Sequence, residues 1–295
     1  MVAHLRQDSE KSRFPYSVLM SVYHREEPRY LKESVASMMD QTDPPGEFVL
    51  VCDGPLGRQL DCAIDDLLAD YGSVLHVVRL ADNVGLGPAL NAGLVKCSNE
   101  FVARMDSDDV SSPDRCRLQL EAFANDPRLE IVGGWVGEFK NTPKDSDSIR
   151  IVPETNEEIC DFAKVRSPFN HMTVMFRKSS VLSVGGYRSI PLCEDYDLWA
   201  RMLISGCRAF NIQKVLVWMR VNRETLARRR QPAVHKARVQ IKRDLFKGGF
   251  MTRSEYVWSL LLDFAIAHAP LSVMSWATSR LLRDEGRDKG GSNGK

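Results

Sequence analysis

Three carboxylates stand close together in the stretch MDSDD at 105–109, which follows a short apolar run, FVAR, at 101–104. Such a run indicates a strand, so the carboxylates lie in the loop that leaves its end, where open α/β sheets bind ligands. Asp106 and Asp108 could hold one divalent cation, and oxygen ligands with no thiolate nearby favour Mg²⁺ or Mn²⁺. An Asp-rich loop built on an Asx turn would contain the same residues, so both interpretations stay open here.

A second acidic group, CEDYDLW at 193–199, opens a predicted helix. Carboxylates at a helix start are often plain partners of the helix dipole. A metal-assisted sugar transfer, however, needs one carboxylate apart from the metal to deprotonate the acceptor hydroxyl, and Asp195 could supply it. An aspartate is ionised at neutral pH without special tuning, because its ordinary pKa is ~3.9.

Two further loops follow apolar runs. Asp53 could accept the imide N–H of a uracil ring, although Asp-Gly-Pro is by itself an ordinary turn. The stretch DNVGLG at 82–87 would let a nucleotide lie close to backbone N–H groups, but it is neither a dinucleotide fingerprint nor a Walker motif. His171, just before another apolar run, could bind the metal or the acceptor, although a packed structural histidine is the commoner case.

Alternating strands and helices must position these loops. Apolar runs predict strands, and periodic apolar positions between them predict helices, so the first hundred residues indicate a doubly wound parallel sheet with right-handed crossovers. Ser111, Ser112 and Pro113 predict the next helix start, with serine at the cap and proline in the first turn. The predicted strands are 16–22, 48–52, 74–80, 101–105, 131–139, 172–176 and 215–221, and the predicted helices begin at 28, 61, 88, 113, 156 and near 197.

Composition limits the compartment and the partners. With 295 residues and a net charge of +1, the chain can bury a large core and carries no global signal for nucleic acid. Its seven cysteines form no CxxC pair, which fits a reducing cytosol rather than a disulfide framework or a zinc site. The polar start lacks the apolar core of a signal peptide, and nothing reaches the roughly 18 apolar residues of a membrane span. We therefore expect a cytoplasmic protein.

From about residue 16 to 221 the chain resembles the inverting family 2 glycosyltransferases of the GT-A fold, especially those of bacterial exopolysaccharide and O-antigen synthesis. Several motifs in a fixed order make this resemblance far more specific than any one of them. They are SVLMSVY at 17–23, VCDG at 51–54, NVGLG at 83–87 with NAG at 91–93, MDSDD at 105–109, NH at 170–171 and CEDYDLW at 193–199.

The resemblance implies a mixed GT-A sheet, a nucleotide-sugar donor, a saccharide or lipid-linked acceptor, and Mn²⁺ or Mg²⁺. By the same resemblance Asp108 would bind the metal, Asp106 the ribose or the metal, Asp195 would be the general base with Glu194 beside it, and His171 could be a further metal ligand. The residues expected to bind the nucleotide sugar are Ser21, Val22, Tyr23, Asp53, Asn83, Gly85, Asp106, Asp109 and Arg220.

Two departures from the family pattern bear on how many sugars are transferred and on which groups stabilise the diphosphate. The Gln/Arg-x-x-Arg-Trp motif of processive members is missing after Asp195, which favours transfer of one sugar per acceptor. Many relatives have an arginine where this chain has Pro88-Ala89-Leu90, so charge stabilisation of the diphosphate would rest on the metal and on Arg104 or Arg220. Two alternatives remain open, a nucleotidyltransferase and a non-catalytic sugar-nucleotide-binding protein.

The predicted organisation is a flexible start (1–14), a catalytic domain (15–230), a C-terminal helical region (231–284) and a disordered tail (285–295). Residues 220–253 hold eleven Lys/Arg against two Asp/Glu. Within them, Ala237, Ile241 and Leu245 share one face of a basic amphipathic helix, which could lie on the anionic inner face of the plasma membrane. A helix that merely covers the core, with its basic face in solvent, would show the same pattern.

Overall fold

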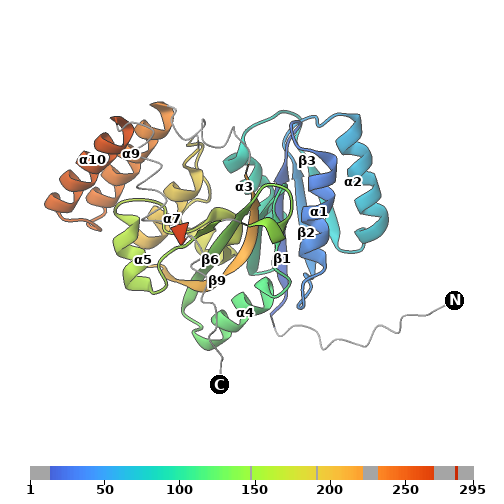
Figure 1. Ribbon diagram of the computed structural model, residues 1–295, viewed down its shortest axis with the longest axis horizontal. Coiled ribbons are helices and arrows are strands. Elements are labelled where there is room, and N and C mark those ends of the chain that lie inside the picture. The colour runs from blue at the N-terminus through green and yellow to red at the C-terminus, as the bar shows by residue number, and fades with distance from the viewer. Residues whose placement is uncertain (1–13, 147, 191, 222–231, 269–282, 285–295) are drawn as a thin grey trace, which may run out of the picture.

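The computed structural model describes residues 14–146, 148–190, 192–221, 232–268 and 283–284. The predicted flexible start and disordered tail lie outside these ranges, apart from Phe14. Figure 1 shows one curved sheet with helices on both faces and a helical pair at one end.

Four parallel strands form the first half of the sheet, in the order β3-β2-β1-β4. Each is a run of mostly apolar residues, which a parallel sheet covered on both faces requires. The predicted strand–helix alternation is confirmed. Its elements are β1 (Tyr16–Val22), α1 (Pro28–Met39), β2 (Glu47–Cys52), α2 (Arg58–Tyr71), β3 (Leu75–Arg79), α3 (Leu86–Lys96) and β4 (Phe101–Asp106).

The second half makes the sheet mixed. Strand β8 (Met175–Arg177) lies antiparallel between β4 and β6 (Leu129–Phe139), and β9 (Arg208–Arg220) runs parallel to β6. The remaining elements here are β5 (Val110–Ser111), α4 (Arg115–Asn125), η1 (Pro143–Asp145), β7 (Ser148–Arg150), α5 (Asn156–Ala163), η2 (His171–Thr173), α6 (Lys178–Ser183) and α7 (Glu194–Ile204).

One predicted helix start is wrong. Val110 and Ser111 form the short strand β5, which pairs antiparallel with Trp218 and Val217 of β9, so neither serine caps a helix. Helix α4 begins only after Asp114, its N-cap residue, and Pro113 lies outside it. Local propensity is overridden here, because pairing with a strand about a hundred residues later uses these backbone groups.

Two predicted strands differ in length from those observed. The run predicted at 172–176 is partly a 3₁₀ turn, His171–Thr173, so β8 is short. The Thr173 hydroxyl donates to the Asn170 carbonyl at 2.8 Å, a local bond of the kind that competes with a strand. Strand β9, in contrast, begins at Arg208, well before the predicted residue 215, because its polar first half pairs with β6.

The core lies on both faces of the sheet, since successive side chains of a strand point to opposite sides. Val18 and Met20 of β1 pack with α1, α2 and α4 on one face, while Leu19 packs with α3, α5, α6 and α7 on the other. The loops that leave β1, β2, β3 and β4 therefore emerge at one edge, with α3 and α7 on the same face.

Two helices follow the sheet, α9 (Pro232–Lys247) and α10 (Arg253–His268). Of the two interpretations of the first helix, the structure supports the one in which it covers the core, because Ala237, Ile241 and Leu245 of α9 are buried against α7. The helical region also ends differently from the prediction, since β10 (Arg283–Asp284) pairs antiparallel with β7. Within the described ranges, no helix combines the length and hydropathy that a membrane crossing needs.

Candidate functional site

The first strand and the Asp-rich loop are neighbours at the carboxyl edge of the sheet. Ser21 of β1 is in register with Asp106, the last residue of β4, and the Ser34 hydroxyl of α1 donates to the Asp106 carbonyl at 2.6 Å. Ser21 and Tyr23 are half-buried and Val22 is buried at this edge. The structure thus brings three of the residues expected to bind the nucleotide sugar beside the predicted cation ligand Asp106.

The Asp-rich loop is a concentration of negative charge. Asp106 forms an ion pair with Arg104 at 2.5 Å. Asp109 is buried, and its carboxylate oxygen Oδ2 has no hydrogen-bond partner in the described part of the chain. Burial, together with the charges of Asp106 and Glu26, raises the pKa of Asp108 from 3.8 to about 7. Burial, with the charges of Asp108 and Asp106, also raises the pKa of Asp109 well above its ordinary value.

This donor set fits a divalent cation. Burial and, after it, mutual repulsion raise the pKa values of Asp108 and Asp109, and a bound cation would offset both effects; carboxylate oxygens are also the ligands that Mg²⁺ and Mn²⁺ prefer. A site with one or two protein carboxylates is sufficient for such an ion, because substrate phosphates and water complete its coordination.

The third predicted ligand is otherwise engaged. The His171 ring nitrogen Nε2 lies 3.0 Å from the Tyr187 hydroxyl, and the ring meets Trp199 edge-on. Burial lowers the pKa of His171 well below its ordinary value, and Arg104 adds to this effect. Among the described residues, no three His, Cys, Asp or Glu side chains are grouped so that they could hold a metal ion. The three predicted ligands Asp106, Asp108 and His171 are thus not assembled as a set.

Arg104 connects the two acidic groups of the site. It lies on β4 two residues before Asp106, so both side chains point to the face that carries α3 and α7. Burial raises the pKa of Asp108 and Asp109 on one side and of Glu194 and Asp195 on the other, and the positive charge of Arg104 offsets part of that rise. Two of its buried nitrogens, Nε and Nη1, have no hydrogen-bond partner among the described residues. A buried cation with unused donors is suited to binding an anionic or hydroxyl-rich ligand.

Glu194 and Asp195 are the first two residues of α7. Burial raises the pKa of both carboxyl groups, and the nearby charge of Asp106 raises that of Asp195 further. Gly87 of α3 lets this helix end approach, since a Cβ atom there would lie 3.0 Å from the Arg188 carbonyl oxygen and 3.5 Å from the Glu194 Cβ. A carboxylate with a raised pKa is a stronger base, and it lies on the same face as the Asp-rich loop.

Asp53 and Asn83 hold two loops together. The buried Asp53 carboxylate accepts hydrogen bonds from the Val84 N–H at 2.7 Å and the Gly85 N–H at 3.0 Å, while Asn83 donates to the Asp53 carbonyl at 3.0 Å. Gly54 has a φ of +83°, and a Cβ there would lie 2.6 Å from the Asn83 nitrogen. The predicted nucleotide residues that follow β2 and β3 are therefore adjacent, with Asn83 exposed and Gly85 half-buried.

Arg220 ends β9 beside the Asp-rich loop. Its backbone N–H donates to Asp109 at 2.9 Å and its Nε donates to the Asp108 carbonyl at 3.2 Å. Its guanidinium also pairs with Glu33 at 2.7 Å and lies 3.8 Å from the Tyr30 ring centroid. These contacts favour a structural role, in which Arg220 holds the Asp-rich loop in place. They do not favour the predicted role, in which Arg220 contacts the pyrophosphate.

Sequence reasoning missed Glu26 and Tyr187. Glu26 accepts a hydrogen bond from the Ser107 hydroxyl at 2.5 Å, and its charge acts on Asp108. Its position just after β1, at the ligand-binding edge, was a usable signal. Tyr187 exchanges two hydrogen bonds with Asn91 through its backbone, at 2.7 and 2.8 Å, and no local pattern indicated that pairing.

The sequence matches the model of a known family and several characterised proteins. Residues 17–184 match the model described as Glycosyl transferase family 2. A UDP-Gal:alpha-D-GlcNAc-diphosphoundecaprenol beta-1,3-galactosyltransferase of Escherichia coli is 32% identical over 91% of this chain and 96% of its own length. The amylovoran biosynthesis glycosyltransferase AmsE of Erwinia amylovora is 38% identical over 77% of this chain and 84% of its own length.

Solved structures agree in fold at lower identity. The mannosyltransferase PcManGT of Pyrobaculum calidifontis, in complex with GDP-Man and Mn²⁺, superposes with a TM-score of 0.63 at 18% identity, over 90% of this chain and 79% of that one. TarS 1–349 of S. aureus, in complex with UDP-GlcNAc, gives 0.62 at 17% identity, over 90% of this chain and 76% of that one. The predicted GT-A fold is confirmed, and the chain belongs to glycosyl transferase family 2.

Proposed function

We propose that this protein transfers one sugar, with inversion, from a UDP-sugar to a lipid-linked saccharide during surface polysaccharide synthesis. The observation that carries the proposal is the position of Arg104, a buried cation that pairs with Asp106 of the Asp-rich loop and lies on the sheet face that carries α7 and Asp195. A cation site in the Asp-rich loop and the buried charge of Arg104 could stabilise a leaving diphosphate, while the separate carboxylate of Asp195 acts as the base.

The donor and the acceptor are argued from relatives. The E. coli relative is named for UDP-Gal and a diphosphoundecaprenol-linked acceptor, and TarS was solved with UDP-GlcNAc. PcManGT was solved with GDP-Man, so the identity of the donor's nucleobase, uracil or guanine, has to be tested directly. A lipid-linked acceptor also leads us to propose that the protein works in the cytoplasm at the inner face of the membrane.

In the proposed reaction, Asp195 accepts the proton of an acceptor hydroxyl. The resulting oxygen attacks the anomeric carbon from the side opposite the nucleotide, the bond from that carbon to the diphosphate oxygen breaks, and the nucleoside diphosphate leaves. A single displacement with no covalent nucleophile inverts the anomeric carbon. Because burial raises the pKa of Asp195, its carboxylate accepts a proton more readily than an exposed aspartate would.

The remaining site residues would bind the cation, the phosphate groups and the nucleoside. Asp108 and Asp106 would hold Mn²⁺ or Mg²⁺, which neutralises the charge that develops on the leaving diphosphate. Nε and Nη1 of Arg104, which lack protein partners, would donate to a phosphate oxygen or a donor hydroxyl. Ser21, Tyr23 and the Asp53–Gly85 pair of loops would receive the nucleoside.

Calorimetry with UDP, GDP and dTDP tests this proposal. Each nucleotide is titrated in Mn²⁺ and in EDTA, into the wild type, Asp108→Ala and Asp70→Ala, the last an exposed carboxylate of α2 that serves as the control. We expect UDP binding that requires Mn²⁺ and is lost only in Asp108→Ala. Equal binding in EDTA, or no nucleotide binding at all, would contradict the proposal. Transfer from UDP-sugars to a lipid-diphosphate saccharide then identifies the donor.

A further inference from the structure

Glu26 lies in the turn between β1 and α1, at the edge of the sheet where the Asp-rich loop emerges. Its backbone N–H donates to the Tyr23 carbonyl at 3.1 Å, which closes that turn directly after the strand. Pro28 then opens α1, with Glu27 as its N-cap residue. The backbone of Glu26 is thus fixed by a strand end before it and a helix start after it.

The Glu26 side chain crosses from this turn to the loop that leaves β4. Its Oε2 accepts a hydrogen bond from the hydroxyl of the buried Ser107 at 2.5 Å, and its Oε1 accepts the Glu27 N–H at 2.9 Å. The two loops can meet because β1 and β4 are neighbours in the sheet. With one oxygen held by its own turn, the carboxylate presents the other to Ser107 in a fixed direction.

Ser107 stands between the two predicted cation ligands, Asp106 and Asp108. Every residue of 106–109 is held by a contact from outside this stretch. Arg104 and Ser34 bind Asp106, Arg220 binds Asp108 and Asp109, and Glu26 binds Ser107. Strand β4 ends at Asp106, and the chain turns at Ser107 and Asp108. Glu26 therefore holds the turn that sets the direction of one ligand relative to the other.

A carboxylate at this place has an electrostatic cost that a neutral acceptor would avoid. Burial raises the pKa of Asp108 to about 7, and the charges of Asp106 and Glu26 add to this effect. A side-chain amide would accept the same hydrogen bond from Ser107 without repelling Asp108. The hydrogen bond alone therefore does not explain the charge of Glu26. A divalent cation at Asp106 and Asp108 does explain it, because the same charge would attract that cation.

We infer that Glu26 is a positioning residue of the cation site, which holds the turn carrying Asp106 and Asp108 through its hydrogen bond with Ser107. It acts from behind the ligands, because both of its carboxylate oxygens already accept hydrogen bonds. Replacing a group that orients metal ligands typically weakens metal binding by about 10–100-fold. The inference rests on the proposed function, since it deepens the part that assigns the cation to the Asp-rich loop.

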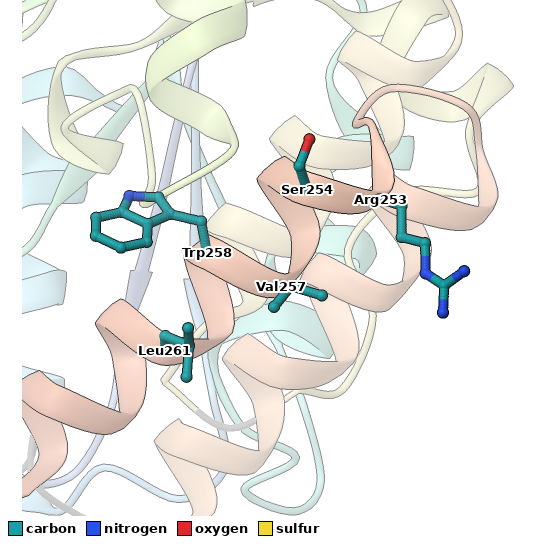
Figure 2. Close-up of a pocket in the computed structure, with 5 residues that line it drawn as sticks. All are labelled: Arg253, Ser254, Val257, Trp258 and Leu261. Atoms are coloured by element: carbon teal, nitrogen blue, oxygen red, sulfur yellow. The ribbon is translucent and has the colours of Figure 1, made fainter.

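Mn²⁺ binding to the full chain tests this role without turnover. The free ion is followed by its electron paramagnetic resonance signal, in protein alone and in protein with UDP, against a blank of UDP without protein. The controls for Glu26→Ala and Ser107→Ala are Glu27→Ala, the exposed neighbour, and Ser254→Ala, beside the open groove on α10 in Figure 2. Each site variant should bind Mn²⁺ about 10–100-fold more weakly, and neither control should differ from the wild type.

A double variant shows whether Glu26 acts through Ser107. If it does, Glu26→Ala with Ser107→Ala should bind Mn²⁺ no more weakly than Glu26→Ala, because both substitutions remove the same contact. Glu26→Gln keeps an acceptor for the Ser107 hydroxyl but loses the charge, so its affinity should lie between those of the wild type and Glu26→Ala. Additive losses, or a glutamine variant as weak as the alanine one, would overturn the inference.

Thermal unfolding distinguishes this role from a merely structural one. In EDTA at pH 8, the Tm of Glu26→Gln should equal or exceed that of the wild type, because a charge that repels Asp108 is gone. A fixed concentration of Mn²⁺ should then raise the Tm of Glu26→Gln by less, because a more weakly bound ion stabilises less. A lower Tm in EDTA with an unchanged rise in Mn²⁺ would contradict the inference.

Asp108→Ala in the same titration separates failure of the inference from failure of the proposed function. If Asp108→Ala loses Mn²⁺ binding while Glu26→Ala and Ser107→Ala keep wild-type affinity, the proposed cation site is supported and only the role of Glu26 is overturned. If Asp108→Ala binds Mn²⁺ as the wild type does, the cation lies elsewhere, and the inference fails together with that part of the proposed function.

Discussion

Arg104, which is buried, and Asp106, which is half-buried, form an ion pair with 2.5 Å between guanidinium nitrogen and carboxylate oxygen at the end of the central strand β4. Alternation along the strand puts both side chains on the same face, so the pair holds the first carboxylate of the Asp-rich loop toward α7. The arginine side chain is only 2% exposed, and a charge so far from water persists only when it is paired.

Arg104→Met should therefore lower both stability and activity. Removing the cation leaves a cluster of partly buried carboxylates without their counter-charge. Because the Asp106 side chain is 28% exposed, we expect a loss below the roughly 3–5 kcal/mol of a fully buried pair. Urea denaturation measures that loss. The double variant Arg104→Met with Asp106→Asn should regain part of the stability but none of the transfer activity, because the donors Nε and Nη1 remain absent. Full activity in the folded double variant would exclude Arg104 from substrate binding.

Asp195→Asn should reduce kcat by roughly 10²–10⁴, the range for loss of a general base. Its affinity for UDP with Mn²⁺ should change little, because the donor side of the site keeps its charges. Glu194→Gln, beside it on α7, is the matched control and should cost far less. In the wild type, the raised pKa of Asp195 should move the acid limb of kcat/KM above the usual range of aspartate. Loss of UDP binding in Asp195→Asn would refute the assignment.

Asp108 gives the stability of the metal-free protein a pH dependence. Its pKa is about 7 in the folded state against an ordinary 3.8, so between these values the folded protein holds a proton that the unfolded chain has released. That contribution makes stability fall as pH rises through this window. In EDTA at pH 8, Asp108→Asn should be more stable than the wild type by about 1–3 kcal/mol, and the difference should shrink toward pH 4.

A metal titration provides the control for this pH effect. Saturating Mn²⁺ should raise the Tm of the wild type at pH 8 and leave Asp108→Asn nearly unchanged, since a ligand stabilises only the state that binds it. Equal Tm values for the two proteins in EDTA at pH 5 and at pH 8 would show that ionisation of Asp108 does not destabilise the metal-free protein.

The sequence predicted those parts of the fold that local patterns determine. The run at 16–22 is strand β1 to the residue, because a continuous apolar stretch can be satisfied only inside a covered sheet. Two of the site carboxylates, Asp53 and Asp108, lie in loops that follow strands, and a third, Asp195, lies in the first turn of a helix. Residues that form turns and helix starts can be recognised in the sequence. The loops around them could therefore be placed at one edge in advance.

Long-range pairing accounts for what the sequence could not give. Ser111 had the local character of a helix cap, but its partner Val217 lies far along the chain in β9. The apolar face of α9 looked suitable for lipid, but the matching surface of α7 covers it, and nothing in the sequence of α9 distinguishes the two uses. Arg104 was recognised as a charge near the site, while its unused donors depend on three-dimensional packing.

His171 provides the last test, because a structural histidine and a metal ligand respond differently to substitution. Its Nε2 lies 3.0 Å from the hydroxyl of the buried Tyr187, so Tyr187→Phe leaves a partly buried nitrogen without its partner at a cost of about 1 kcal/mol. We expect that loss in urea denaturation for Tyr187→Phe and a similar one for His171→Gln. Both variants should keep Mn²⁺-dependent UDP binding, in contrast to Asp108→Ala. Loss of the metal dependence in His171→Gln alone would instead make this residue a ligand, and the cation would then have to lie closer to α7 than the Asp-rich loop.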